Sequence, residues 1–291
     1  ESEWATRSET LPSMKLNHWH DVRDWYRGFL DAGLRADVVP LAYDWTGYKT
    51  IVLPTVLSLS DEDVLRIADF AKAGGTVIVG YAAGLIDEHF HIGLGGYPGA
   101  GNGLLRDMLG IRSEEFNILG EEAEDEPAEI GLSNGLTTRL WQNDVTSVAP
   151  DTRVLATYVG TAAADWELDG VPAITSRTYG NGTAIYVGCD LNRHDIAQLL
   201  KALGSRWQEL SAQPTESGQT PTYPTTDPRI LHTIRRSADG STRFDFYLNR
   251  SNQPVAINGV EGDPIIAHRC ETDAVGYTLN RNAILIAKTS C

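Results

Sequence analysis

The sequence predicts an α/β domain followed by a small antiparallel all-β domain. In the first part, a helix, two strands, a second helix and a third strand follow one another, and the strands are apolar almost throughout. Strands without polar alternation are typical of a parallel sheet that helices cover on both faces. We expect this domain to span 1–207, a linker rich in Pro, Thr, Ser and Gln to span 208–228, and the β domain to span 229–291.

The first predicted helix runs from Asn17 to Ala32, and Gly33 follows it as a stop signal. Its apolar side chains recur at helical spacing and share one face, so we expect that face to lie in the core. These side chains are Trp19, Val22, Tyr26, Phe29 and Leu30.

Two strands, a capped helix and a third strand come next. Ser60 can cap a helix that begins at Asp61, and Asp63 stands three residues after it, as in a capping box. Gly74-Gly75 ends this helix. The strands are predicted over 36–40, 48–54 and 76–81, and the buried stripe of the helix at Val64, Ile67, Ala68 and Ala71.

Beyond a glycine-rich loop over 93–103 and a short helix over 104–109, the pattern becomes strand-rich. Asn181-Gly182 predicts a hairpin, because both residues tolerate positive φ. A helix over 194–203 closes the first domain. Strands are predicted over 140–145, 154–159, 173–178 and 183–187, and in the β domain over 230–236, 242–248, 255–257, 264–267 and 283–287.

The strand 76–81 runs into a tight turn of small residues, Ala82-Ala83-Gly84. In α/β hydrolases and amidotransferases, an elbow of this kind lifts a Ser or Cys nucleophile above the sheet. Here the middle of the turn offers only Ala82. We interpret it as a vacant nucleophile elbow, which favours a structural role over acyl-transfer chemistry.

Composition excludes several classes of partner. The chain has 39 acidic and 24 basic residues and a net charge of −15, which disfavours binding to nucleic acid or to an anionic membrane. No apolar run is long enough to span a bilayer. The acidic run Glu121–Glu126 is interpreted as a solvated loop. Three cysteines without metal-like spacing indicate a reducing compartment, so cytoplasm is the default location.

Several segments resemble, in order, the C-terminal portion of the family 42 glycoside hydrolases, which are β-galactosidases. The opening residues 1–5 are similar to the end of that family's catalytic barrel, so we expect the chain to come from inside a longer protein. The helix from His18 to Phe29 resembles the first helix of the family's second domain. The other similar passages are 48–54, 57–62, 74–76, 81–88 and Phe246-Tyr247-Leu248-Asn249-Arg250-Ser251.

The resemblance implies a three-part enzyme. A catalytic (β/α)₈ barrel precedes a flavodoxin-like domain of the class I glutamine-amidotransferase type, used for trimerisation, and a small antiparallel β domain follows. This chain resembles the second and third parts only. In the family, both catalytic glutamates and a cysteine-bound zinc belong to the barrel, so no residue here inherits those roles. The resemblance therefore implies two kinds of partner, the other copies in a homotrimer and the missing catalytic barrel. It also implies that this chain has no catalytic, substrate-binding or metal-binding residue and no cofactor.

Acidic residues at strand ends are candidates for a catalytic pair. A retaining glycosidase needs two carboxyl groups about 5 to 5.5 Å apart. The candidates are Asp87, Glu88 and Asp190. Asp87 and Glu88 are neighbours just past a turn, where helix-start electrostatics already account for acidic residues, and we favour the structural interpretation.

Cysteine and histidine offer two further candidates. Cys189 precedes His194 by five residues, and a Cys–His pair can activate a thiolate, although a single Cys at a strand end is more often a small buried hydrophobe. Metal binding is the second candidate, with structural roles again favoured. At a helix start, the spacing of His18 and His20 points the rings apart; His89 and His91 suit a site better.

Tryptophan leaves two interpretations open. Trp19 is expected in the core, whereas Trp45, in the loop 43–48, is a candidate for contact with another subunit or with the barrel. Two rival functions remain: a stand-alone amidotransferase-like hydrolase, and a carbohydrate-binding module that uses aromatic rings as stacking platforms.

Overall fold

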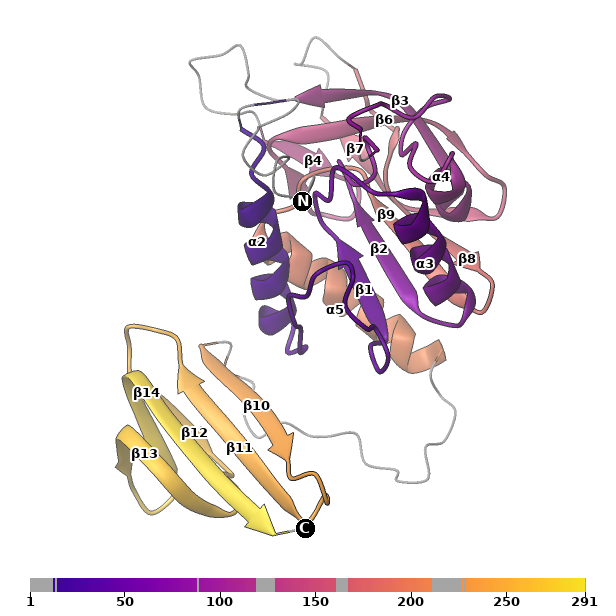
Figure 1. The fold of residues 1–291 in the computed structure, drawn as a ribbon. Coiled ribbons are helices and arrows are strands. Elements are labelled where there is room, and N and C mark those ends of the chain that lie inside the picture. The colour runs from indigo at the N-terminus through magenta and orange to yellow at the C-terminus, as the bar shows by residue number, and fades with distance from the viewer. Residues whose placement is uncertain are drawn as a thin grey trace. The chain divides into compact units, whose positions relative to one another are not determined.

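The computed structural model describes residues 13, 15–87, 89–118, 129–160, 167–210, 227 and 229–290, with the side chains of 205–210 excepted. The chain forms two compact units, residues 1–29 with 36–201 and residues 30–35 with 202–291 (Figure 1). Each unit is described by itself.

The first unit is built on a seven-stranded sheet of order β1-β2-β9-β8-β7-β4-β5. Only β1, β2 and β9 run parallel, and the strands beyond β9 are antiparallel, so the sheet is mixed and the prediction of a parallel sheet is wrong for its second half. The strands are β1 Thr50–Leu53, β2 Thr76–Gly80, β4 Ile130–Leu132, β5 Thr137–Thr138, β7 Thr152–Val159, β8 Pro172–Tyr179 and β9 Gly182–Val187.

A two-residue turn explains why the sheet changes direction. Tyr179 pairs with Gly182, so the loop between β8 and β9 is Gly180-Asn181, and a loop this short can join only antiparallel strands. The predicted hairpin is confirmed, but its turn begins one residue earlier than expected. Gly180 adopts φ +61°, which suits a glycine at the first turn position.

The helix α3 (Asp61–Lys72) is capped as predicted. The Ser60 side chain accepts a hydrogen bond from the Asp63 amide at 3.2 Å, and the Asp63 carboxylate accepts one from the Ser60 amide at 3.4 Å. The predicted stripe is buried, and it packs in one core with β2, β9 and the short helix α4 (Leu104–Leu109). All five residues of β2 are buried, so both faces of this strand are covered.

The helix α2 (His18–Asp31) buries a different face from the predicted one. Its buried residues are Trp25 and Gly28, whereas Trp19 is 57% exposed and Tyr26 37% exposed. The core placement of Trp19 is therefore wrong. A Cβ on Gly28 would lie 2.4 Å from Ile196 of the helix α5 (Arg193–Leu210), so close backbone approach decides which face turns inward.

Two further predictions about strands differ from the structure. Residues 36–40 form no strand: Val38 is 61% exposed, and the segment pairs with no neighbour in the described part of the chain. A two-stranded antiparallel sheet of β3 (Ile111–Ile118) and β6 (Trp141–Val148) was only half predicted. Register shifts at Ser113 break the alternation of β3, which hides it from a period-two search.

The second unit is a five-stranded antiparallel sheet, as predicted. Its order is β10-β11-β14-β12, and β13 also pairs with β14. The core side chains include Ile230, Tyr247, Leu279 and Leu285. The strands are β10 Ile230–Arg236, β11 Thr242–Asn249, β12 Val255–Asn258, β13 Asp263–Thr272 and β14 Gly276–Ser290. No helix among the described residues has the length and apolar content to cross a membrane.

Candidate functional site

The turn after β2 is present, and Ala82 is buried within it, 1% exposed. The Ala83 amide donates to the Gly80 carbonyl at 3.1 Å, and the Gly84 amide donates to the Val56 carbonyl at 2.9 Å. The positive φ of the turn, +68°, falls on Gly84 and not on Ala82. Ala82 packs in an apolar cluster with Leu57 and Trp141, so the position expected to hold a nucleophile is part of the core.

A carboxylate and a phenol meet next to this turn. The Tyr81 hydroxyl donates to Asp21 Oδ2 at 2.6 Å, joining α2 to the end of β2. Burial raises the pKa of Asp21 to about 6, an effect that hydrogen bonds from Tyr81 and Thr55 oppose and the charge of Asp190 adds to. Burial also raises the pKa of Tyr81. Sequence reasoning missed Asp21 because it lies between the apolar positions of its helix.

Asn143 on β6 completes the buried polar cluster. Its Nδ2 group donates to the Tyr81 carbonyl at 2.8 Å and to the Tyr186 hydroxyl, and its Oδ1 accepts from Trp141 Nε1 at 2.7 Å. The backbone amide of Asn143 donates to the Tyr158 hydroxyl at 3.1 Å, and that hydroxyl donates to the Gly188 carbonyl at 3.0 Å. Both polar atoms of the Asn143 side chain, Nδ2 and Oδ1, are therefore hydrogen-bonded within the protein.

The Asp190 carboxylate accepts hydrogen bonds mainly from backbone amides. Its Oδ1 accepts hydrogen bonds from the Thr138 hydroxyl at 2.6 Å and from the amides of Arg139, Leu140 and Trp141 at 3.1, 2.6 and 2.8 Å. The carboxylate therefore fixes the turn that leads into β6, which explains its place at the end of β9 without a catalytic role.

Cys189 and His194 do not form a reactive pair. The cysteine is 1% exposed, whereas His194 is exposed at the start of α5. Burial raises the pKa of the Cys189 thiol, and the nearby carboxylates raise it further. A thiolate nucleophile requires the opposite shift, so the geometry supports the small-hydrophobe interpretation.

Neither histidine pair belongs to a metal-like cluster in the part of the chain that the structure describes. The His18 ring lies 2.9 Å from the Thr55 carbonyl, while His20 is exposed, so the two rings diverge as expected from the helical spacing. His91 Nδ1 lies 3.2 Å from Asp87 Oδ2 on the surface. Within the described residues, no three His, Cys, Asp or Glu side chains could hold an ion together. Glu88 lies outside the described residues.

Asp87 organises the loop that carries these histidines. Its carboxylate accepts hydrogen bonds from the amides of His89 and His91, each at 2.8 Å. These contacts, with that of the His91 amide the largest, hold the pKa of Asp87 below its usual range. An exposed carboxylate of lowered pKa is a poor general acid, which fits the structural interpretation of this residue.

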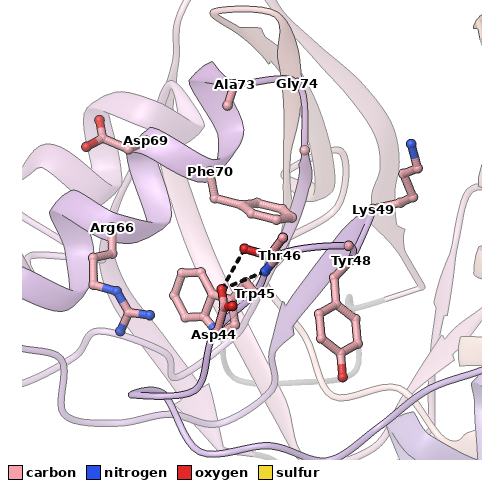
Figure 2. Close-up of a pocket in the computed structure, with 12 residues that line it drawn as sticks. Asp44, Trp45, Thr46, Tyr48, Lys49, Arg66, Asp69, Phe70, Ala73 and Gly74 are labelled. Atoms are coloured by element: carbon pink, nitrogen blue, oxygen red, sulfur yellow. Dashed lines mark hydrogen bonds between the residues drawn. The ribbon is translucent and has the colours of Figure 1, made fainter. Parts of the chain in front are cut away.

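Trp45 lines an open notch of about 540 Å³ between α3 and the loop before β1 (Figure 2). Phe70 meets the indole edge to face, with ring centroids 6.1 Å apart. The Arg66 guanidinium lies over the indole at 4.3 Å and donates to the carbonyls of Leu41 and Tyr43 at 2.8 and 3.0 Å. The indole is therefore half-buried and held by its own domain.

The packing around Trp45 limits what the notch can bind. A sugar ring stacks on an open aromatic face, and Arg66 occupies one face of the indole while Phe70 packs against the same ring. Asp44 is engaged with Thr46, accepting from its amide at 2.9 Å and its hydroxyl at 2.7 Å (Figure 2). The arrangement counts against a stacking platform at Trp45, and its role in a subunit or barrel contact stays a prediction.

Comparison with known proteins identifies the family. Residues 1–211 match the family described as β-galactosidase trimerisation domain, and residues 230–289 match the β-galactosidase C-terminal domain. The chain belongs to glycoside hydrolase family 42. It comprises the trimerisation and C-terminal domains of these β-galactosidases, as the resemblance implied.

Individual relatives agree with this assignment. The chain is 36% identical over 290 residues to β-galactosidase BbgII of Bifidobacterium bifidum and 30% identical over 269 residues to a β-galactosidase of Arthrobacter sp.. It covers 39% and 35% of those two proteins, so it spans well under half the length of the curated relatives it matches.

Solved structures support the same fold. The whole chain superposes on the cold-adapted β-galactosidase of Rahnella sp. R3 with a TM-score of 0.75 at 23% identity, covering 40% of that chain. For the β-galactosidase of Bacillus circulans sp. alkalophilus, the TM-score is 0.73 at 23% identity, with 99% of this chain and 40% of that chain covered.

Proposed function

We propose that this chain is the assembly portion of a β-galactosidase that removes terminal β-D-galactose residues from β-galactosides, lactose among them, with retention of configuration. In that role it joins three copies into a homotrimer and shapes the entrance of the active site. The observation that carries the proposal is the match of both family domains, together nearly the length of the chain.

The chemistry of the site supports a role in assembly. A retaining glycosidase needs two carboxyl groups that face a sugar across about 5 to 5.5 Å. Asp190 is engaged by a hydroxyl and three amides, and Asp87 by two amides and a histidine. Ala82 offers no nucleophile. We therefore place the bond-breaking carboxylates in a barrel outside this chain and expect the isolated chain to hydrolyse nothing.

The finer features of the proposal follow from the resemblance. We propose an amidotransferase-like ancestry for the first domain, with Ala82 in the place of a lost nucleophile, and helices on both faces of its sheet. A cytoplasmic location agrees with free thiols at Cys189 and Cys270. The resemblance places the family's zinc in the barrel, and we propose that this chain holds none; among the described residues, no three His, Cys, Asp or Glu side chains could bind an ion together.

One pair of measurements tests the proposal. Light scattering on the purified chain is expected to give the mass of three chains, and an assay with a chromogenic β-galactoside is expected to give no turnover. Adding the catalytic barrel as a separate polypeptide should give hydrolysis, and the chain without the barrel should give none. A monomeric chain would refute the assembly role, and galactose release at enzymatic speed by the chain alone would refute the non-catalytic role.

A further inference from the structure

The loop that follows the turn at Ala82 exposes three apolar side chains at alternate positions. Their exposed fractions are 42% for Phe90, 56% for Ile92 and 94% for Leu94. We refer to these three residues as the apolar ledge. Single exposed apolar residues are ordinary, but a group of them on one short loop marks a contact surface, because their transfer out of water is favourable.

The N-terminal side of the loop is fixed by Asp87. Its carboxylate accepts the amides of His89 and His91, and its own amide donates to the His91 carbonyl at 3.0 Å. Ile86 forms an antiparallel bridge with Ile92. The backbone on both sides of Phe90 is therefore held by the loop itself.

The C-terminal side is fixed by α4 and β3. The Arg106 guanidinium donates to the Gly96 carbonyl at 2.6 Å, and Tyr97 exchanges two backbone hydrogen bonds with Ser113, at 2.6 and 3.0 Å. A loop whose backbone is fixed while its apolar side chains point outward loses little conformational entropy when it binds, which favours a preformed docking surface.

The distribution of charge along the sequence favours another copy of this chain as the partner. A chain with a net charge of −15 repels its own copies, so a contact between copies is best tolerated where the surface carries no acid. From His89 to Leu105 the chain has no Asp, Glu, Lys or Arg, the longest such run in the sequence. The ledge lies inside this run and inside the residues that match the trimerisation domain.

We propose that the apolar ledge forms one half of the contact between copies of this chain in its trimer. The proposal rests on the assembly role proposed above and assigns that role to Phe90, Ile92 and Leu94. In a ring of three, each contact joins two different surfaces, so the ledge of one copy packs against another part of the next copy and not against its own counterpart.

The test is Leu94→Lys in the full 291-residue chain, with Leu65→Lys as matched control. Leu65 is 53% exposed on α3, outside the ledge. Both substitutions lower the net negative charge equally, so general repulsion between copies changes by the same amount in each. Sedimentation velocity over a concentration series gives the association constants, and urea unfolding checks that the fold is intact.

We expect Leu94→Lys to weaken association at least about 30-fold and Leu65→Lys to leave it within about twofold, because only the first buries a charge in the contact. Unchanged association of Leu94→Lys beside a trimeric parent chain overturns the ledge and leaves the assembly role standing. Equal weakening by both variants also overturns it. A monomeric parent chain refutes the assembly role itself, and the ledge as a contact between copies with it.

Discussion

Two regions adjoin at the end of β2, and they differ in where their side chains find partners. Behind the turn, the Asn143 side chain bonds to its buried neighbours, accepting from Trp141 Nε1 and donating to the Tyr81 carbonyl. Beyond the turn, the side chains of the apolar ledge have no chemistry to offer and face solvent, Leu94 at 94% exposure.

This difference concerns where the first unit can offer a binding surface. The ends of parallel strands are where α/β folds usually place ligands. Here that edge is filled by the indole of Trp141 and the phenol of Tyr81, whose ring centroids lie 5.4 Å apart. The exposed apolar side chains lie instead on the loop next to it, and the proposal of a contact between copies rests on them.

The buried cluster is broken most severely by Asn143→Ala. The change leaves Trp141 Nε1 and the Tyr186 hydroxyl buried without their partner, and each orphaned polar group costs about 1–3 kcal/mol. We expect a loss of about 4 kcal/mol in the free energy of unfolding, measured in urea.

The control for this prediction is Asn117→Ala on the neighbouring strand. Asn117 makes one long hydrogen bond, 3.5 Å, to Gln142. We expect its loss to cost less than about 1 kcal/mol. Equal costs for Asn117→Ala and Asn143→Ala would mean that the cluster is not a closed network.

How much of this could be predicted from the sequence depended on the range of the interactions. The cap at Ser60 and the hairpin before β9 rest on neighbours in sequence, and both were predicted. The antiparallel β domain was predicted from short strands separated by turn residues. The buried face of α2 was not, because it is decided by Gly28 against Ile196 and by Asp21 against Tyr81, partners far along the chain. Periodicity reports which side of a helix is apolar, not which side has a partner.

The candidate site divides in the same way. That the turn after β2 carries Ala82 and no Ser or Cys can be read from a single position, and the structure places that residue in the core. Asn143 and Asp21 gave no signal, because an isolated Asn in a strand or Asp in a helix looks like an ordinary surface residue. The apolar ledge gave no signal for a related reason, because the exposure of Phe90, Ile92 and Leu94 cannot be read from the sequence.

Trp45 lies between the two kinds of region, since it is half-buried yet lines an open notch. Trp45→Ala removes the packing on Phe70 and the ring beneath Arg66. We expect this to cost about 3 kcal/mol of unfolding free energy. Tyr43→Ala in the same loop, whose side chain is 50% exposed, should cost less than about 0.5 kcal/mol.

The same variant separates folding from assembly. If Trp45 contacts another subunit, Trp45→Ala should also lower the mass measured by light scattering under conditions where the chain stays folded. A trimer mass that does not change would leave Trp45 with a structural role alone, and the ledge as the region that carries the contact.

The smallest expected effect concerns the charge that the buried cluster holds. The pKa of Asp21 is raised from 3.8 to about 6 in the folded chain, chiefly by burial. Above pH 4 the unfolded carboxyl has largely lost its proton while the folded one retains it until about pH 6. The folded state thus binds more protons, and its stability falls as pH rises through this window. Two pKa units correspond to at most about 3 kcal/mol.

Asp21→Asn isolates this contribution, because the amide has the same shape and does not titrate. Other carboxylates, such as Asp87 with its lowered pKa, change stability in the opposite direction and are common to both proteins. The difference in unfolding free energy between Asp21→Asn and the parent chain should therefore grow by about 2 kcal/mol from pH 4 to pH 7. Tyr81→Phe removes a hydrogen bond that lowers the pKa of Asp21 in the folded chain, so it should move the upper end of this window to higher pH. A difference in unfolding free energy that does not change with pH would mean that water reaches Asp21 and that the polar cluster is not closed.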